Sequence, residues 1–199
     1  MDSLQTVALA GGLAWASGMR LYAVVFLAGL LGRLDYLHLP STLQVLENPW
    51  VLGLSGVLLL VEFLADKIPV VDSLWDGVHS FIRIPAGALL AALALGDHDP
   101  ALMVVAGLLG GTLSAGTHAL KAGSRALINT SPEPFSNIAT SLGEDALVTS
   151  GLAVAIFHPL LFLILLGVFV LLLVWLLPKL WRGARSILGG LFRRPRTDV

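Results

Sequence analysis

Runs of apolar residues follow one another along this chain, separated by short polar connections. The runs cover residues 4–34, 50–66, 72–95, 101–128, 138–157 and 160–177. A helix needs about 20 predominantly apolar residues to cross the hydrocarbon core of a bilayer. The pattern therefore predicts an all-α, polytopic membrane protein with about six transmembrane segments, some of them broken or kinked.

Two of these segments contain residues that interrupt a regular helix. The first is too long for one simple span and contains Ser17-Gly18-Met19-Arg20 near its middle. We expect either a broken helix whose loosened backbone is covered by protein, or one long tilted helix with Arg20 facing a polar partner. In the third segment Pro85 predicts a kink, because apolar residues continue on both sides of it.

Two polar connections contain prolines. Residues 33–49 are expected to carry a short interfacial helix. In residues 129–137, Ser131 is a candidate N-cap with Pro132 at the first helical position. The alternative is a gating loop whose carbonyl groups line a vestibule, with Asn129, Ser131, Glu133 and Asn137 as its polar members.

The chain is expected to form one transmembrane domain, residues 1–182, followed by a basic cytoplasmic tail, residues 183–199. Gly11-Gly12 and Gly110-Gly111 begin similar local patterns, so residues 1–99 and 100–182 are candidate 3+3 inverted repeats. Many secondary transporters have this arrangement. Such matches also arise by chance in a chain rich in Gly, Ala and Leu.

Composition supports the membrane class. Hydrophobic residues make up 56% of the 199 residues and charged residues only 13%, whereas a soluble domain is about one quarter charged. The net charge of −1 gives no long-range attraction to nucleic acid. The absence of cysteine excludes disulfides and thiolate metal ligands. With six spans and the basic tail inside, the positive-inside rule predicts cytoplasmic N- and C-termini.

Six acidic residues lie within or beside the apolar segments: Glu62, Asp66, Asp72, Asp76, Glu144 and Asp145. Spacings of three and four residues place Glu62 with Asp66 on one helix face, and Asp72, Asp76 and His79 on the next. A charged side chain in the membrane costs about 2.5–3.5 kcal/mol on insertion scales, so it marks a candidate functional site. Close carboxylates repel, so we expect one of them to hold a proton near neutral pH.

Two interpretations of these acidic residues remain open. In the first, all six form an ion- or proton-binding site, and Glu62, Asp66, Asp76 and Glu144 are candidate ligands of a bound divalent cation. Arg20, His79 and His118 are then candidate substrate or gating residues. In the second, Asp72 is only a helix N-cap, Asp66 pairs with Lys67 and Asp76 pairs with Arg83.

Two motifs resemble those of a family of bacterial integral membrane proteins, domain of unknown function 4126. They are Glu62-Phe63-Leu64-Ala65-Asp66-Lys67-Ile68-Pro69, with Asp72-Ser73-Leu74-Trp75-Asp76 after it, and residues 129–137, Asn-Thr-Ser-Pro-Glu-Pro-Phe-Ser-Asn. The resemblance covers nearly the whole chain. It implies a multi-pass protein of the bacterial inner membrane and no specific activity or ligand.

A second resemblance is to the Glu-x-Gly-Asp-Lys signature of a manganese/calcium–proton exchanger family built from two three-span inverted repeats. Glu62, Asp66 and Lys67 match it with a spacing one residue longer, and Ala65 stands where that family has glycine. The second copy would consist only of Glu144 and Asp145. These departures mean that no residue roles carry over.

The sequence therefore predicts a transporter of a small cation, divalent or monovalent and proton-coupled, with the bilayer and a small ion or solute as its partners. The alternative is a membrane scaffold or assembly protein whose charges are paired internally. No nucleic acid and no cofactor beyond a bound divalent cation are expected, and a homo-oligomer is compatible with the pattern. We expect no enzyme, because the chain contains no Gly-x-Ser-x-Gly, His-Glu-x-x-His or phosphate-loop motif.

Overall fold

The computed structural model of this chain describes residues 2–96, 98–128 and 134–191. Its helices are α1 (Ser3–Arg33), the 3-10 helix η1 (Ser41–Glu47), α2 (Pro49–Ala65), α3 (Pro69–Ala94), α4 (Pro100–Ile128), α5 (Pro134–Phe157) and α6 (Pro159–Leu191). Within these residues every regular element is helical, which confirms the predicted all-α class.

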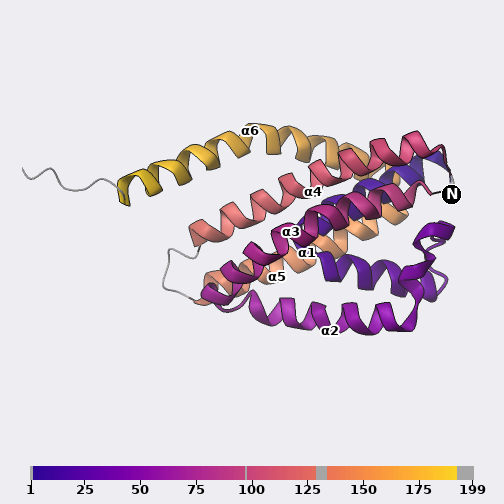
Figure 1. Cartoon of the computed structure of the whole chain (residues 1–199), viewed down its shortest axis with the longest axis horizontal. Coiled ribbons are helices and arrows are strands. Elements are labelled where there is room, and N and C mark those ends of the chain that lie inside the picture. Colours follow the sequence, from indigo (N-terminus) through magenta and orange to yellow (C-terminus); the bar gives the residue numbers. More distant parts are fainter. Residues whose placement is uncertain (1, 97, 129–133, 192–199) are drawn as a thin grey trace, which may run out of the picture.

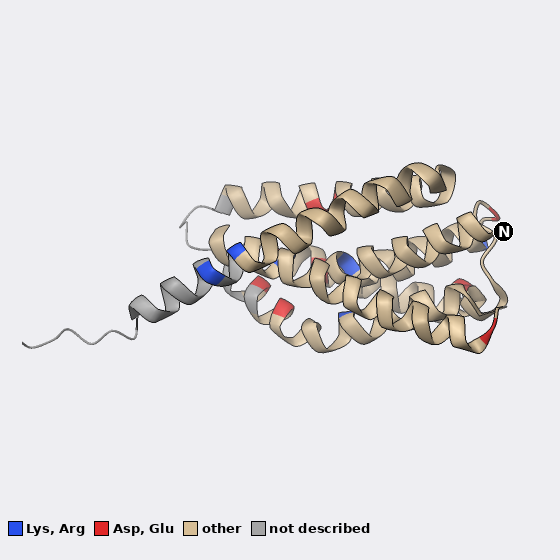
Figure 2. Cartoon of the chain, turned by 90° about the horizontal axis from the view of Figure 1, so that it is seen from above, with Lys and Arg blue, Asp and Glu red and all other residues tan. Residues whose placement is uncertain are grey.

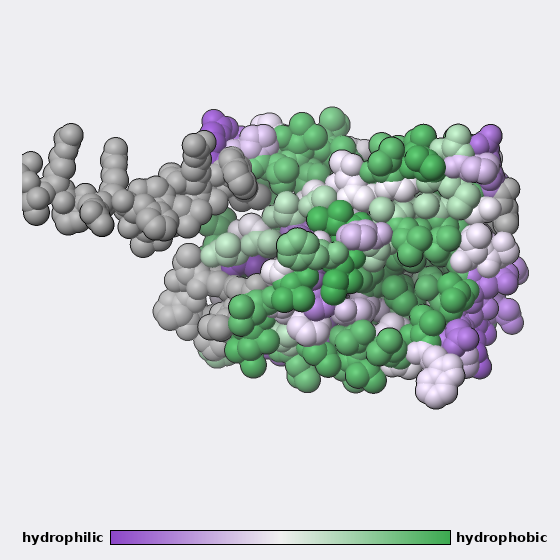
Figure 3. Space-filling view, in the orientation of Figure 1, coloured by the Kyte–Doolittle hydropathy of each residue, from purple (hydrophilic) through white to green (hydrophobic). Residues whose placement is uncertain are grey.

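The lengths and hydropathy of the helices confirm a membrane protein. In the described part of the chain five helices are long and apolar enough to cross a bilayer, and η1 with α2, bent by 64°, makes a sixth. On the face shown in Figure 3, apolar side chains cover much of the bundle, and many of the hydrophilic atoms gather at the end where the N-terminus lies. Large side chains such as Leu108, Leu171 and Phe81 are more than two-thirds exposed, as expected for surfaces that face lipid.

α1 folds back on itself at Arg20, where the backbone angles (φ −144°, ψ 76°) are not helical. Gln5 and Leu9 of its first arm line a cavity together with Tyr36 and Leu37, which follow its second arm. A straight helix would hold residues 5 and 36 about 45 Å apart. Both ends of α1 therefore lie at the same end of the bundle, and α1 is a re-entrant hairpin with Arg20 at its tip (Figure 1).

Glycines let both arms of this hairpin pack closely on their neighbours. A Cβ atom on Gly18 would overlap the backbone of Ser114 in α4 and lie 2.8 Å from the Cβ atom of Thr117. A Cβ atom on Gly29 would overlap the carbonyl group of Leu46 in η1. Of the two conformations expected for the first segment, the broken helix covered by protein is confirmed.

The re-entrant α1 changes the predicted topology. The prediction of two cytoplasmic termini requires the first segment to cross the membrane, and the structure shows that it turns back. The N-terminus and the end of α6 lie at opposite ends of the bundle (Figure 1). The structure fixes only that these two points lie at opposite ends of the bundle, so the side of the membrane on which each terminus lies stays a prediction.

Other boundaries agree with the sequence in part. The expected interfacial helix is η1, and Asn48 caps α2 by accepting a hydrogen bond from the Trp50 amide. α3 continues through Pro85, and α6 continues through Pro178 to Leu191, so the predicted tail begins inside a helix. The proposed N-cap at Ser131 lies outside the described residues.

Candidate functional site

Four basic and six acidic side chains lie together inside the bundle, close to the tip of the α1 hairpin. We call them the charge network; its members are Arg20, Arg83, Lys121 and Arg125 with Glu62, Asp66, Asp72, Asp76, Glu144 and Asp145. Elsewhere along the helices charged turns are few and widely separated (Figure 2). All members except Asp145 are buried, and Arg20, Glu62, Asp66, Asp72 and Arg83 have no exposed surface.

Arg20 joins the hairpin tip to α5 and to the end of α2. Its Nη1 atom lies 2.5 Å from Asp66 Oδ2, and its Nε atom lies 3.1 Å from Asp145 Oδ1. Nη2 donates a hydrogen bond to Ser141 Oγ (2.9 Å) and lies 3.5 Å from Glu144 Oε2. The irregular backbone at Arg20 is thus held by charge pairs from two other segments, which a buried guanidinium needs.

Arg83 joins α3 to α2 and α4. Its Nη2 atom donates to Glu62 Oε1 at 2.5 Å, and its Nη1 atom donates to Asp76 Oδ1 at 2.7 Å. Arg83 and Asp76 are seven residues apart and lie on the same face of α3. Nη1 also lies 3.3 Å from Nδ1 of His118. Ser114 Oγ donates to the Arg83 carbonyl oxygen, which ties the same turn to α4.

Arg125 forms the third guanidinium pair. Its Nε and Nη2 atoms donate to the two oxygens of Glu144, at 3.0 and 2.9 Å, in the parallel two-bond geometry that makes arginine–carboxylate pairs strong. Its Nη1 atom donates to Asn137 Oδ1 at 3.2 Å and to the Asp66 carbonyl oxygen at 3.3 Å. These contacts fix the end of α4 to α5 and to the α2–α3 connection.

Lys121 lies among three of the carboxylates. Its Nζ atom is 3.4 Å from Asp76 Oδ1, 3.5 Å from Asp66 Oδ2 and 3.7 Å from Glu144 Oε2. It also donates to the carbonyl oxygen of Met19, at 3.3 Å. Each of these carboxylates has a shorter contact with an arginine, so the ammonium group is shared among the three pairs.

Lys67, next to Asp66 in the sequence, forms no ion pair with the ten described network members, although its charge interacts electrostatically with Asp145 and Asp66. Its Nζ atom donates to the Phe63 carbonyl oxygen at 2.9 Å and lies 2.9 Å from the centroid of the Phe63 ring. Burial lowers the pKa of this ammonium group below its usual value. The interpretation that Asp66 pairs with Lys67 does not hold, because the Asp66 carboxylate faces Arg20 instead.

The two histidines beside the network are held in different tautomers. His79 Nδ1 lies 2.8 Å from the Trp75 carbonyl oxygen, which can only accept, so Nδ1 carries the hydrogen. The Nε2 atom of a neutral His79 then accepts from the hydroxyl group of Tyr22, at 3.0 Å. His79 therefore connects α3 to the second arm of α1.

His118 has the opposite arrangement. Its Nδ1 atom faces the Nη1 donor of Arg83 and accepts, so Nε2 carries the hydrogen and donates to Ser80 Oγ at 2.6 Å. Ser80 Oγ in turn donates to the carbonyl oxygen of Asp76. A proton added to His118 would have to displace the Arg83 donor.

The network contains more acidic groups than basic ones. Six carboxylates and four basic groups give a formal charge of −2 when all are ionised. Glu62 Oε2, Asp66 Oδ1 and Asp76 Oδ2 are buried acceptors without a hydrogen-bond partner. Such a site favours bound protons or an added cation, because unbalanced buried charge is costly.

The structure brings most of the predicted site residues together. All six predicted acidic residues belong to the network, with Asp72 interacting electrostatically with Arg125. Arg20 is a network member, His79 and His118 border it, and Asn137 contacts Arg125. Asn129, Ser131 and Glu133 lie outside the described residues.

Sequence reasoning missed Lys121 and Arg125 as site residues. Ser114, Thr117, Lys121 and Arg125 recur at intervals of three and four, which places them on one face of α4. All four are buried. That polar stripe in an otherwise apolar helix was the signal that could have identified both bases.

The four predicted divalent-metal ligands each face a basic side chain. Glu62, Asp66, Asp76 and Glu144 each face an arginine, and among the described residues no three histidine or acidic side chains are placed to hold one ion. Divalent cations need several oxygen ligands around one point. The carboxylates converge on basic side chains instead.

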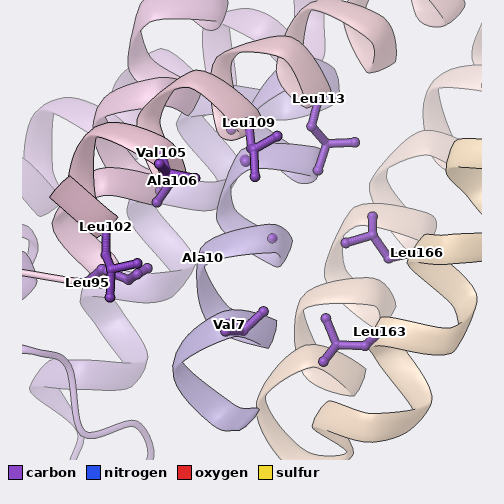
Figure 4. Close-up of a pocket in the computed structure, with 14 residues that line it drawn as sticks. Val7, Ala10, Leu95, Leu102, Val105, Ala106, Leu109, Leu113, Leu163 and Leu166 are labelled. Carbon is purple, nitrogen blue, oxygen red and sulfur yellow. The ribbon is translucent and has the colours of Figure 1, made fainter. Parts of the chain in front are cut away.

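A separate cavity of about 280 Å³ lies between α1, α3, α4 and α6 and is lined only by apolar residues and glycines, among them Val7, Leu109 and Leu166 (Figure 4). It offers no polar group to an ion, so it is not part of the candidate site.

Comparison with known proteins places the chain in a family. The family described as domain of unknown function (DUF4126) matches residues 7–179, which include every described member of the charge network. No curated protein and no solved structure matches the chain. On the strength of this match over most of its length, the chain belongs to the DUF4126 family.

Proposed function

We propose that this protein transports a small monovalent cation across the bacterial inner membrane, coupled to protons, through the charge network. The observation that carries this proposal is the excess of two acidic groups in a buried network built around a re-entrant hairpin. Irregular backbone within a membrane occurs where protein covers it or where it lines a cavity. In transporters, broken helices of this kind commonly border the ion site.

The charge balance favours a monovalent cargo. The four basic groups already neutralise most of the acidic charge, so the remaining formal charge of −2 can be met by protons or by small monovalent cations. The absence of a three-ligand cluster in the described residues argues in the same direction. Because Arg20, Glu62, Asp66 and Arg83 are fully buried, the structure corresponds to an occluded state in this proposal.

The basic residues support an orientation. Lys67 lies in the α2–α3 connection, and Lys179 and Arg182 lie in the last turns of α6; both segments are at the end of the bundle away from the N-terminus (Figure 1). Arg33, at the end of α1, is the basic residue of the described helices at the other end. By the positive-inside rule we propose that the end of α6 is cytoplasmic and that the N-terminus is on the opposite side.

A scaffold is the second candidate function. Two sets of contacts are typical of permanent internal ion pairs. Arg125 makes two hydrogen bonds to Glu144, and Arg83 pairs with both Glu62 and Asp76. Buried ion pairs of this kind also serve to fix a unique packing arrangement. The two functions differ in whether ions cross the membrane.

Ion flux in proteoliposomes distinguishes the two functions. The purified protein is tested with ammonium, potassium, sodium, manganese and calcium ions under imposed pH gradients, together with Glu62→Gln and Glu144→Gln. We expect flux of at least one monovalent cation in the wild type and its loss in both variants. Asp35→Asn is the matched control, because Asp35 is exposed and its positive φ of 59° suits asparagine. Absence of flux for every ion, or equal flux in all variants, would support the scaffold.

A further inference from the structure

Lys121 is bound less tightly than the three arginines of the charge network. The shortest carboxylate contacts of Arg20, Arg83 and Arg125 are 2.5, 2.5 and 2.9 Å, whereas the nearest oxygen to Lys121 Nζ among the described residues is the Met19 carbonyl oxygen, at 3.3 Å. The Lys121 side chain is nevertheless only 1% exposed. Its ammonium group is therefore enclosed by oxygen atoms without forming a close pair with any one of them.

The oxygen atoms around Lys121 Nζ come from four different segments. Met19 lies directly before the break in α1, Asp66 directly follows α2, Asp76 lies on α3 and Glu144 on α5. Three carboxylate oxygens and one carbonyl oxygen at 3.3–3.7 Å make a ligand set suited to a single positive charge. Lys121 is the cation that fills this position and joins all four segments to α4.

A second observation indicates that this position can bind a ligand. Asp66 Oδ1 and Asp76 Oδ2 belong to two of the surrounding carboxylates, and both are buried without a hydrogen-bond partner. The two residues are 0% and 4% exposed. Lys121 contacts the other oxygen of each group, Asp66 Oδ2 and Asp76 Oδ1, so each of these two carboxylates keeps one buried oxygen that can accept a bond from a ligand.

We propose that Lys121 carries a tethered ammonium group in the cation-binding position of this protein, and that a free monovalent cation binds in the same place when the ammonium group leaves it. This inference rests on the proposed transport function and names its binding site. Lysine suits the role because its ammonium group is a compact charge on a flexible stem, whereas a guanidinium group requires a planar, fixed arrangement of acceptors. Ammonium and potassium ions are the free cations closest to it in size and charge.

Thermal unfolding of Lys121→Ala in detergent tests this site without measuring transport. The variant is compared in ammonium, potassium, sodium and choline chloride at one ionic strength. We expect at least one small cation, but not choline, to raise the midpoint by about 3 °C or more, because a ligand that binds only the folded state stabilises it. Wild type should show no such difference, since its own ammonium group fills the site.

Lys67→Ala is the matched control, because the ammonium group of Lys67 makes its direct contacts with the ring and carbonyl group of Phe63 and forms no ion pair with the described oxygens around Lys121. Lys121→Gln, which keeps most of the length of the side chain without its charge, is measured in parallel in case the alanine variant folds poorly. Recovery of folded Lys121→Ala only in the presence of a small cation also supports the proposal. Equal midpoints in all four salts for both Lys121 variants, or failure of both to fold in every salt, would overturn it.

The outcomes separate this inference from the proposed function. Wild-type flux without any cation response of the Lys121 variants would contradict the tethered ammonium group and leave transport standing. A cation response without flux under any condition would establish the binding site and contradict transport.

Discussion

At the scale of single residues, arginine and lysine have different tasks in this protein. Arg83 bridges Glu62 and Asp76 with two separate nitrogen atoms, so one planar group fixes the distance between α2 and α3. Lys121 presents one nitrogen atom to several oxygens and fixes no such distance. We infer that the arginines hold the network together and that Lys121 is its exchangeable member.

Arg83→Lys tests the bridging role. An ammonium group cannot reproduce both contacts, so we expect a loss of stability of about 1.5–3 kcal/mol, the value of one hydrogen bond to a charged group. The measurement is the thermal unfolding midpoint in detergent. Arg33→Lys is the control, because Arg33 is exposed and makes a single bond to the Glu47 carbonyl oxygen. Equal midpoints for the two variants would show that the bridge is dispensable.

At the scale of elements, the α1 hairpin determines where the network forms. Its first arm contacts α4 at Gly18, and the break at Arg20 turns the second arm back toward η1. The tip brings Arg20 and the carbonyl group of Met19 to the carboxylates of the other helices. The turn thus places Arg20 against the end of α2 and against α5, and the neighbouring Met19 against Lys121 of α4.

Gly18→Ala tests the close approach of the hairpin to α4. A Cβ atom there would overlap the Ser114 carbonyl oxygen, which belongs to the backbone and cannot rotate away. We expect a loss of about 1–3 kcal/mol, typical of overpacking, measured as the unfolding midpoint in detergent. Gly143→Ala should be neutral or stabilising, since nothing lies within 4 Å of a Cβ atom at that position. A neutral Gly18→Ala would contradict the hairpin packing.

Hydropathy predicted the helices well because each apolar run is long enough for several helical turns, and Gly18 with Arg20 correctly indicated a break. The return of the second arm could not be predicted, because an apolar run looks the same whether it crosses the membrane or turns back. The six acidic residues were found from their cost in apolar sequence. Their partners depend on contacts between distant segments, such as Arg83 with Glu62, which spacing along one helix does not reveal.

At the scale of the whole molecule, the hairpin separates the two ends of the chain. The natural sequence has no cysteine, so single cysteines can be introduced without a background. We expect Asp2→Cys and Asp99→Cys to react with a membrane-impermeant maleimide from one side of the membrane, and Arg182→Cys from the other. The measurement uses intact spheroplasts and inverted vesicles. Labelling of Asp2→Cys and Arg182→Cys from the same side would contradict the re-entrant topology.

The central claim is that the buried charge network forms the path of a small cation, and Asp66, like Glu144, pairs with three of its basic groups. Asp66 Oδ2 lies within 3.7 Å of Arg20, Lys121 and Arg125 together. The most direct test is therefore monovalent cation flux in proteoliposomes for the wild type, Asp66→Asn and the exposed control Asp35→Asn. The account predicts flux in the wild type and control, and a loss of about tenfold or more in Asp66→Asn, as one lost charge contact of 1.5–3 kcal/mol implies. Equal flux through wild type and Asp66→Asn would contradict it.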